Sequence, residues 1–208
     1  MNRDTRSLRV AGPAGEIEVE VDEPATALRG VAVLCHPHPQ HGGNMSNKVV
    51  QTLARAFLQL GYRAVRFNFR GVGASQGQWD EGRGEVDDAL AVIAAQRDAG
   101  LPAGLPLALG GFSFGAFVAA QAAALLAPQA PVERLVLVGP ATGRVDMPAV
   151  PADTLVVHGE MDEVVPLSAT LDWARPQALP VIVLPGVGHF FHGQLGVLKS
   201  QVIQAWNR

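Results

Sequence analysis

The sequence is poor in cysteine, in long apolar runs and in excess charge, and each shortage excludes a class of protein. Cys35 is the only cysteine, so no disulfide forms within the chain and a reducing, cytoplasmic location is expected. The first ten residues contain no apolar core of the kind that secretory signals need. The longest apolar stretch, Phe114 to Ala127, is shorter than the ~20 residues of a membrane-spanning helix and is interrupted by Gln121.

The charge balance does not favour nucleic acid or a membrane as a partner. A net charge of −3 gives no general attraction to nucleic acid or to anionic membranes. In contrast, an apolar content of 48% in 208 residues is enough for a substantial core and predicts one domain over residues 1–208. The expected partner is therefore a small molecule, bound by a monomer or a homodimer.

Strand-like and helix-like segments alternate along the whole chain. Short apolar runs predict strands at 15–21, 30–36, 63–69, from 105 to the glycines at 110–111, and at 132–138, 154–158 and 179–184. Apolar residues at helical spacing predict helices at 49–60, 85–99, after residue 113, at 168–174 and at 195–206. This alternation predicts an α/β fold with a mostly parallel sheet and helices on both faces. The strand at 15–21 carries glutamates that suit an edge position.

The clearest motif is GFSFG at residues 111–115, between a predicted buried strand and an alanine-rich predicted helix. A G-x-S-x-G sequence at such a junction places the serine in a sharp turn that exposes its hydroxyl. The flanking glycines lack a Cβ, which lets neighbouring backbone approach closely. We interpret Ser113 as a nucleophile; the alternative is an ordinary capping serine in a glycine-rich turn.

An acid and a base follow later strands in the order that this motif requires. Asp162 follows the strand that ends in VVHGEM, and His189 follows VIVLPGVG. Ligands bind at the carboxyl ends of strands in open α/β sheets, where all three residues are expected to meet. Imidazole can take the serine proton, and a carboxylate can fix its tautomer. The competing candidates are Glu160 and Glu163 for the acid and His192 for the base.

The chain resembles the α/β-hydrolase superfamily over nearly its whole length. The resemblance is carried by GFSFG, HGEMDEVVP, GVGHFF and FNFRGVGASQG. The stretch HPHPQHGGNMSNKVV is similar to that of small bacterial carboxylesterase-like serine hydrolases. Dienelactone hydrolases are more distant, because they use cysteine where this chain has Ser113. The resemblance implies an α/β-hydrolase fold, and the short segment 139–153 leaves no room for the lid that many relatives carry there.

The resemblance also implies an oxyanion hole and a substrate pocket. Phe114, directly after the nucleophile, is expected to supply one backbone N–H, and His38 the other. Pro37 and Pro39 have no N–H and are excluded as donors. The pocket candidates are His36, Gly42, Gly43, Asn44, Met45 and Phe190.

Other chemical groups have competing interpretations. The histidines of HPHPQH, His36, His38 and His41, have a spacing compatible with a metal, to which His189 or His192 would add a ligand. No Cys, Asp or Glu cluster accompanies them locally, so neither a metal nor a cofactor is expected.

Three further residues are expected to be structural. Cys35 is predicted to be inert packing, and His158 a buried, hydrogen-bonded residue. Arg70 is predicted to form an ion pair with Asp87 or Asp88 rather than to bind a substrate carboxylate.

These features predict a serine hydrolase that cleaves small ester or thioester substrates through an acyl-enzyme on Ser113. An open cleft without a lid encloses little apolar surface, which disfavours long-chain lipids. The nearest enzyme alternative is a hydrolase of small peptides or aminoacyl groups. From another class, the alternative is a binding protein of the same fold whose triad does not turn over.

Overall fold

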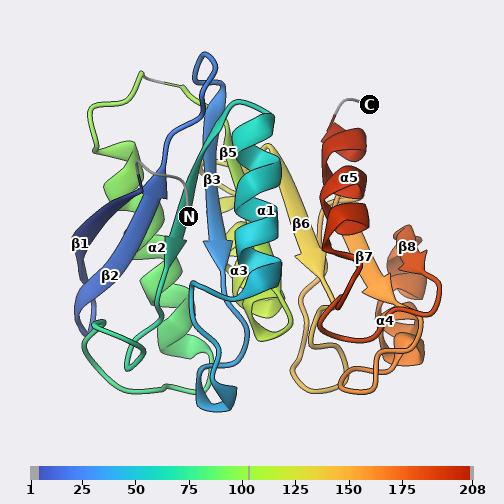
Figure 1. The fold of residues 1–208 in the computed structure, drawn as a ribbon. Coiled ribbons are helices and arrows are strands. Elements are labelled where there is room, and N and C mark those ends of the chain that lie inside the picture. The colour runs from blue at the N-terminus through green and yellow to red at the C-terminus, as the bar shows by residue number, and fades with distance from the viewer. Residues whose placement is uncertain (1–4, 103, 207–208) are drawn as a thin grey trace.

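The computed structural model describes residues 5–102 and 104–206. Within this part of the chain, eight strands form one sheet in the order β1-β2-β4-β3-β5-β6-β7-β8 (Figure 1). β3 to β8 are mutually parallel, whereas β1 and β2 run antiparallel to their neighbours. The strands are β1 Arg6–Gly12, β2 Gly15–Asp22, β3 Gly30–Cys35, β4 Tyr62–Phe67, β5 Leu107–Phe112, β6 Arg134–Val138, β7 Leu155–Gly159 and β8 Val181–Leu184.

Helices cover both faces of the sheet, as the alternating pattern predicted. The helices are α1 Lys48–Gln59, α2 Arg83–Arg97, α3 Phe114–Leu126, α4 Leu167–Ala174 and α5 Leu195–Trp206, with short 3₁₀ turns η1 Pro39–His41 and η2 Arg175–Gln177. Figure 1 shows α1 and α5 on one face and α2 and α3 on the other. The mostly parallel α/β fold class is therefore confirmed.

The two-sided burial explains why the central strands are continuously apolar. Every residue of β3 and of β5 is buried. Successive side chains of a strand point to opposite faces, so Val33 packs with the layer of α2 and α3 while Leu34 packs with the layer of α1 and α5. A parallel strand between two helical layers has no solvent face, which removes the polar alternation seen in exposed strands.

The expected position of the strand GEIEVEV at the sheet edge is wrong. β1 pairs with β2 along its whole length and occupies the edge instead. The polar sequence RSLRVAG of β1 gave no strong strand signal, because most of its side chains are exposed. Glu20 of β2 is buried and pairs with Arg66 of β4 at 2.9 Å. A glutamate in a strand can therefore indicate a buried ion pair rather than an edge.

The loops at the carboxyl ends of the parallel strands lie together along one side of the molecule, at the bottom of Figure 1. Between β6 and β7, residues 139–154 contain turns and one isolated bridge but no helix, so the predicted absence of a lid in this segment is confirmed. In residues 5–102 and 104–206, no helix is long and apolar enough to cross a membrane.

Candidate active site

Ser113 occupies a strained turn between β5 and α3. Its backbone has φ 56° and ψ −118°, a positive φ that is uncommon for residues other than glycine. A Cβ on Gly111 would lie 2.0 Å from the carbonyl oxygen of Gly115. A Cβ on Gly115 would lie 2.3 Å from the carbonyl oxygen of Cys35. Only glycine fits at either position, so the two glycines permit the backbone approach that holds the serine in its turn.

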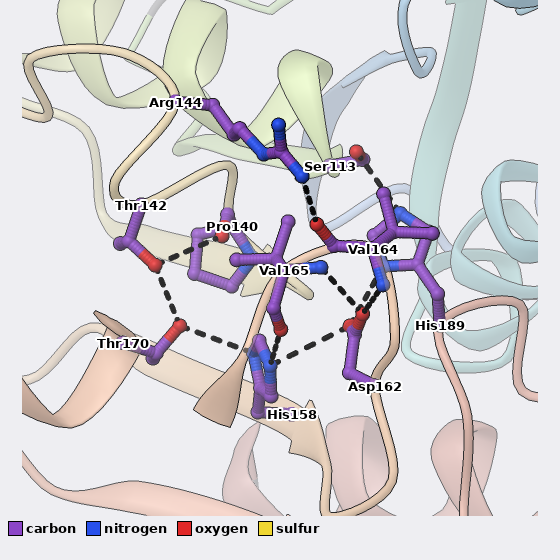
Figure 2. A network of polar contacts seen from close by, with 10 residues as sticks. All are labelled: Ser113, Pro140, Thr142, Arg144, His158, Asp162, Val164, Val165, Thr170 and His189. Carbon is purple, nitrogen blue, oxygen red and sulfur yellow. Dashed lines mark hydrogen bonds and ion pairs between the residues drawn. The ribbon is translucent and has the colours of Figure 1, made fainter. Parts of the chain in front are cut away.

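The ring of His189 connects Ser113 to Asp162 (Figure 2). Its Nε2 lies 3.1 Å from Ser113 Oγ, and its Nδ1 lies 2.6 Å from Asp162 Oδ2. All three side chains are at least nine-tenths buried. They follow β5, β7 and β8, so the sheet topology brings together residues that are 76 and 27 positions apart.

Asp162 is held by the backbone of its own loop. Its Oδ1 accepts hydrogen bonds from the N–H groups of Val164, at 2.9 Å, and Val165, at 2.7 Å. Burial by itself raises the pKa of Asp162, but the hydrogen bonds from His189 and Val165 outweigh it, so the pKa is lowered. The carboxylate is therefore charged at neutral pH and fixes the Nδ1–H tautomer of His189.

A second buried histidine borders the acid. His158 Nε2 lies 2.9 Å from the carbonyl oxygen of Val165 and 3.5 Å from Asp162 Oδ2, while its Nδ1 lies 3.2 Å from the hydroxyl of Thr170. Thr170 in turn bonds Thr142 at 2.8 Å (Figure 2). Burial lowers the pKa of His158, which favours a neutral ring that donates from Nε2 and accepts at Nδ1. The prediction of a buried, hydrogen-bonded histidine is confirmed.

The competing acid and base lie outside this arrangement. Glu163 and His192 are exposed. Within the described residues, no hydrogen bond joins either of them to Ser113 or His189, and the ring of His192 instead contacts Phe190 at 5.8 Å. Glu160 accepts the backbone N–H of Gly186.

Two backbone N–H groups lie at the start of helical turns, and one of them directly follows the serine. Phe114 is the first residue of α3 and His38 precedes η1, so neither N–H has an intrahelical acceptor. The ring of His38 packs against the ring of Phe114, with centroids 5.1 Å apart, and against Trp79 at 4.5 Å. This aromatic contact seats the loop after β3 against the N-terminus of α3.

Both the sequence and the fold of this chain match those of a known protein family. The family model described as serine aminopeptidase S33 matches residues 28–153, and a solved α/β serine hydrolase without a lid from Xanthomonas campestris is 39% identical, with a TM-score of 0.91. This chain is an α/β serine hydrolase of that family. The structural match covers 100% of this chain and 96% of the Xanthomonas protein.

Two further relatives are similar to the hydrolase. An α/β serine hydrolase homologue from Coxiella burnetii is 38% identical, with a TM-score of 0.84 over 96% of each chain. An uncharacterized protein of Rickettsia prowazekii is 43% identical over 112 residues, which are 53% of this chain and 46% of that protein. The match thus spans about half the length of that curated relative.

The expected pocket residues of the hydrolase separate into three groups. Gly42, Gly43, Asn44 and Met45 line a polar cavity of about 540 Å³, together with Glu18, Glu20 and Asn68. None of Ser113, Asp162 and His189 is among its lining residues. The role of residues 42–45 in binding the substrate stays a prediction. Phe190, in contrast, is 44% exposed and its ring contacts His189 at 5.1 Å.

His36 is a structural residue rather than part of an open pocket, which corrects the sequence expectation. It is fully buried; its Nδ1 lies 2.7 Å from the carbonyl oxygen of Pro37 and its Nε2 accepts the N–H of Phe69 at 3.1 Å. Burial lowers the pKa of His36 to about 4, so the ring is neutral. Among the residues that the structure describes, no group of three or more His, Cys, Asp or Glu is placed to hold a metal ion.

Two other predicted structural roles are confirmed. Burial raises the pKa of the Cys35 thiol far above its usual range, so this buried residue is an unreactive thiol. Arg70 forms a bidentate ion pair with Asp88, with the shortest contact at 2.8 Å, and the hydrogen bonds to Asp88 raise the pKa of Arg70.

Proposed function

We propose that the hydrolase cleaves small carboxylic esters or thioesters through an acyl-enzyme on Ser113. The observation that carries the proposal is the pair of contacts made by His189, 3.1 Å to Ser113 Oγ and 2.6 Å to Asp162 Oδ2. A hydroxyl, an imidazole and a carboxylate at these distances are the parts needed for nucleophilic catalysis by serine.

In the first half of the reaction, Ser113 Oγ attacks the ester carbonyl carbon while His189 Nε2 takes its proton. The backbone N–H groups of Phe114 and His38 stabilise the negative oxygen of the tetrahedral intermediate. His189 then gives the proton to the leaving alcohol or thiol, and the C–O or C–S bond breaks. The products of this half are the free leaving group and an ester on Ser113.

In the second half, water attacks the acyl-enzyme. His189 takes a proton from the water, a second tetrahedral intermediate forms in the same hole, and Ser113 leaves with that proton. Asp162 stays ionised throughout and stabilises the imidazolium, which agrees with its lowered pKa. The helix-free segment between β6 and β7 leaves the serine without a lid, which favours short soluble substrates and access of water.

The family description also supports an alternative, the release of amino acids from small peptides or aminoacyl amides. The same acyl-enzyme chemistry would apply, with His189 protonating a leaving amine instead of an alcohol. A comparison of p-nitrophenyl butyrate with the p-nitrophenyl ester of alanine, which share a leaving group and differ in the acyl group, separates the two. The ester proposal expects at least a tenfold higher kcat/KM for the butyrate, and the aminoacyl alternative expects the reverse.

The central test compares the wild type with Ser113→Ala, using Ser168→Ala as a control on the exposed start of α4. Ser113→Ala should lower kcat on p-nitrophenyl butyrate by at least about 10³-fold, and Ser168→Ala should have no measurable effect. A fluorophosphonate should label the wild type and not Ser113→Ala. Activity that survives in Ser113→Ala would sink the mechanism, and absence of labelling in the wild type would favour a binding protein with a non-productive triad.

A further inference from the structure

Arg144 is a charged side chain beside the triad to which no sequence motif pointed. It belongs to the loop between β6 and β7 and is exposed. Its Nη2 donates to the carbonyl oxygen of Val164 at 3.0 Å, and the N–H of the same residue donates to Asp162 at 2.9 Å. Figure 2 shows the guanidinium ending at the carbonyl oxygen of Val164, on the side of the site where Ser113 lies.

The guanidinium has most of its binding capacity free. Arginine carries five N–H donors in a fixed fork, and Val164 is the one acceptor that the guanidinium of Arg144 contacts within residues 5–102 and 104–206. Some other arginines of the chain are ion-paired, among them Arg70 with Asp88 and the exposed Arg175 with Asp172. Across the described residues, no carboxylate lies within ion-pair distance of Arg144.

The nearest carboxylate of the site does not neutralise this charge. Asp162 is buried and is already bonded by His189 and two backbone N–H groups. A planar guanidinium with free donors recognises carboxylates bidentately. An unpaired cation that is bonded to the loop of Asp162 therefore suits a substrate that brings its own anion.

Exposed apolar side chains neighbour the acid and the base along the chain. Met161 is 63% exposed, Val164 36% and Phe190 44%, and all three belong to the loops that carry the acid and the base. Their exposed surface suits a short methylene chain between the scissile carbonyl and a distal charged group.

We propose that Arg144 binds a carboxylate of the substrate, so that the preferred substrates are half-esters or half-thioesters of short dicarboxylic acids. The inference rests on the proposed ester hydrolysis at Ser113. The carboxylate docks on the guanidinium, the methylene chain lies along Val164 and Phe190, and the distal carbonyl reaches the serine.

The test compares two p-nitrophenyl esters of equal acyl length, the anionic hydrogen adipate and the neutral hexanoate. The measured quantity is the ratio of kcat/KM for adipate to that for hexanoate, which cancels general effects on the triad. Arg144→Gln should lower the ratio about tenfold or more, since the variant loses charge-assisted hydrogen bonds to the substrate carboxylate. Arg144→Lys should lower it less, because lysine keeps the charge but loses the fork.

Arg175→Gln is the matched control, because it also removes an exposed arginine, one that pairs with Asp172 at the junction of α4 and η2. The ratio should not change in this variant. Salt provides a second readout: raising it from about 0.01 M to about 1 M shortens the Debye length from ~30 Å to ~3 Å. The wild-type ratio should fall with salt, and the ratio of Arg144→Gln should stay flat. A ratio equal in the wild type and Arg144→Gln overturns the inference while hydrolysis of hexanoate upholds the proposed function.

A binding measurement tests Arg144 independently of turnover. Monomethyl adipate is titrated by calorimetry into Ser113→Ala and into Ser113→Ala/Arg144→Gln. A loss of affinity of at least about tenfold in the double variant supports the inference. It does so even if neither p-nitrophenyl ester is cleaved. Absence of cleavage would overturn the proposed function instead. Equal affinity of the two variants overturns the inference.

Discussion

His36 and His189 are both buried histidines at the carboxyl end of the same sheet, but their rings have opposite kinds of partners. The ring nitrogens of His36 contact the backbone of Pro37 and Phe69. Those of His189 contact two side chains, the Ser113 hydroxyl and the Asp162 carboxylate. Backbone partners fix one neutral tautomer and hold a loop in place. A carboxylate and a hydroxyl partner instead allow the ring to take up the serine proton as an imidazolium that the carboxylate stabilises.

The same division holds for buried carboxylates. Asp22 lies on β2, in the half of the sheet that contains β2, β4 and β3; it is 4% exposed and pairs with Arg66 at 2.8 Å. Asp162 follows β7, in the half that contains β5, β7 and β8; it is 6% exposed and accepts a hydrogen bond from His189. The two aspartates are similarly buried, so their partners decide which of them can support catalysis.

The largest effect that separates the halves is expected from paired carboxylate variants. Asp162→Asn should lower kcat/KM for p-nitrophenyl butyrate by about 10³–10⁴-fold, because an amide does not fix the reactive tautomer of His189. Asp22→Asn should leave kcat/KM within about threefold and lower the free energy of unfolding by about 2–3 kcal/mol, since it weakens a buried ion pair. Steady-state kinetics and urea unfolding measure both. Equal losses of activity in the two variants would erase the distinction.

A smaller effect is expected from the loop after β3, which we assign a backbone role. His38 has φ −52°, a value that proline accepts. His38→Ala removes the ring and keeps the N–H, and should lower kcat less than about tenfold. His38→Pro also removes the N–H, and should lower kcat about 10²–10³-fold, as expected for loss of one oxyanion donor.

Kinetics of the two His38 variants on the same ester make this comparison, and urea unfolding controls for folding. If Ala and Pro at this position have the same kcat, His38 does not donate to the oxyanion and the second donor lies elsewhere.

The smallest effect concerns the pH dependence of stability at His36. Its folded-state pKa is lowered to about 4 by burial, below the ordinary value of about 6.5. As the pH falls below 6.5 the unfolded state takes up the proton first, so stability present at neutral pH is lost between about pH 6.5 and pH 4. The loss attributable to this residue is about 3 kcal/mol.

Urea unfolding at a series of pH values compares the wild type with His36→Gln, which keeps an acceptor for Phe69 and does not titrate. The difference in unfolding free energy between the two proteins should shrink or change sign as the pH falls through this window, while the contributions of His158 and Asp162 cancel. Parallel curves would show that His36 is not held neutral.

Much of this arrangement was predictable from local sequence patterns. Continuous apolar runs predicted β3 and β5, and the glycines around Ser113 predicted the turn, because each feature depends on neighbouring residues alone. The order of Ser113, Asp162 and His189 after successive strands predicted their meeting point, since parallel strands end at one edge. The start of β8 was predicted two residues early. β1 was not predicted at all, because its exposed side chains carry no apolar pattern.

The sequence by itself determined the strand-and-helix alternation, the G-x-S-x-G turn and the identities of the three residues that meet in the candidate active site. Only the tertiary structure decided which histidines and carboxylates have chemical partners. His36 and Asp22 became structural, residues 42–45 came to line a polar cavity with Glu18 and Asn68, and Arg144 came to lie unpaired beside the triad. The physical reason is that these polar groups form hydrogen bonds with residues distant along the chain. A local sequence pattern does not indicate which partner each group will have.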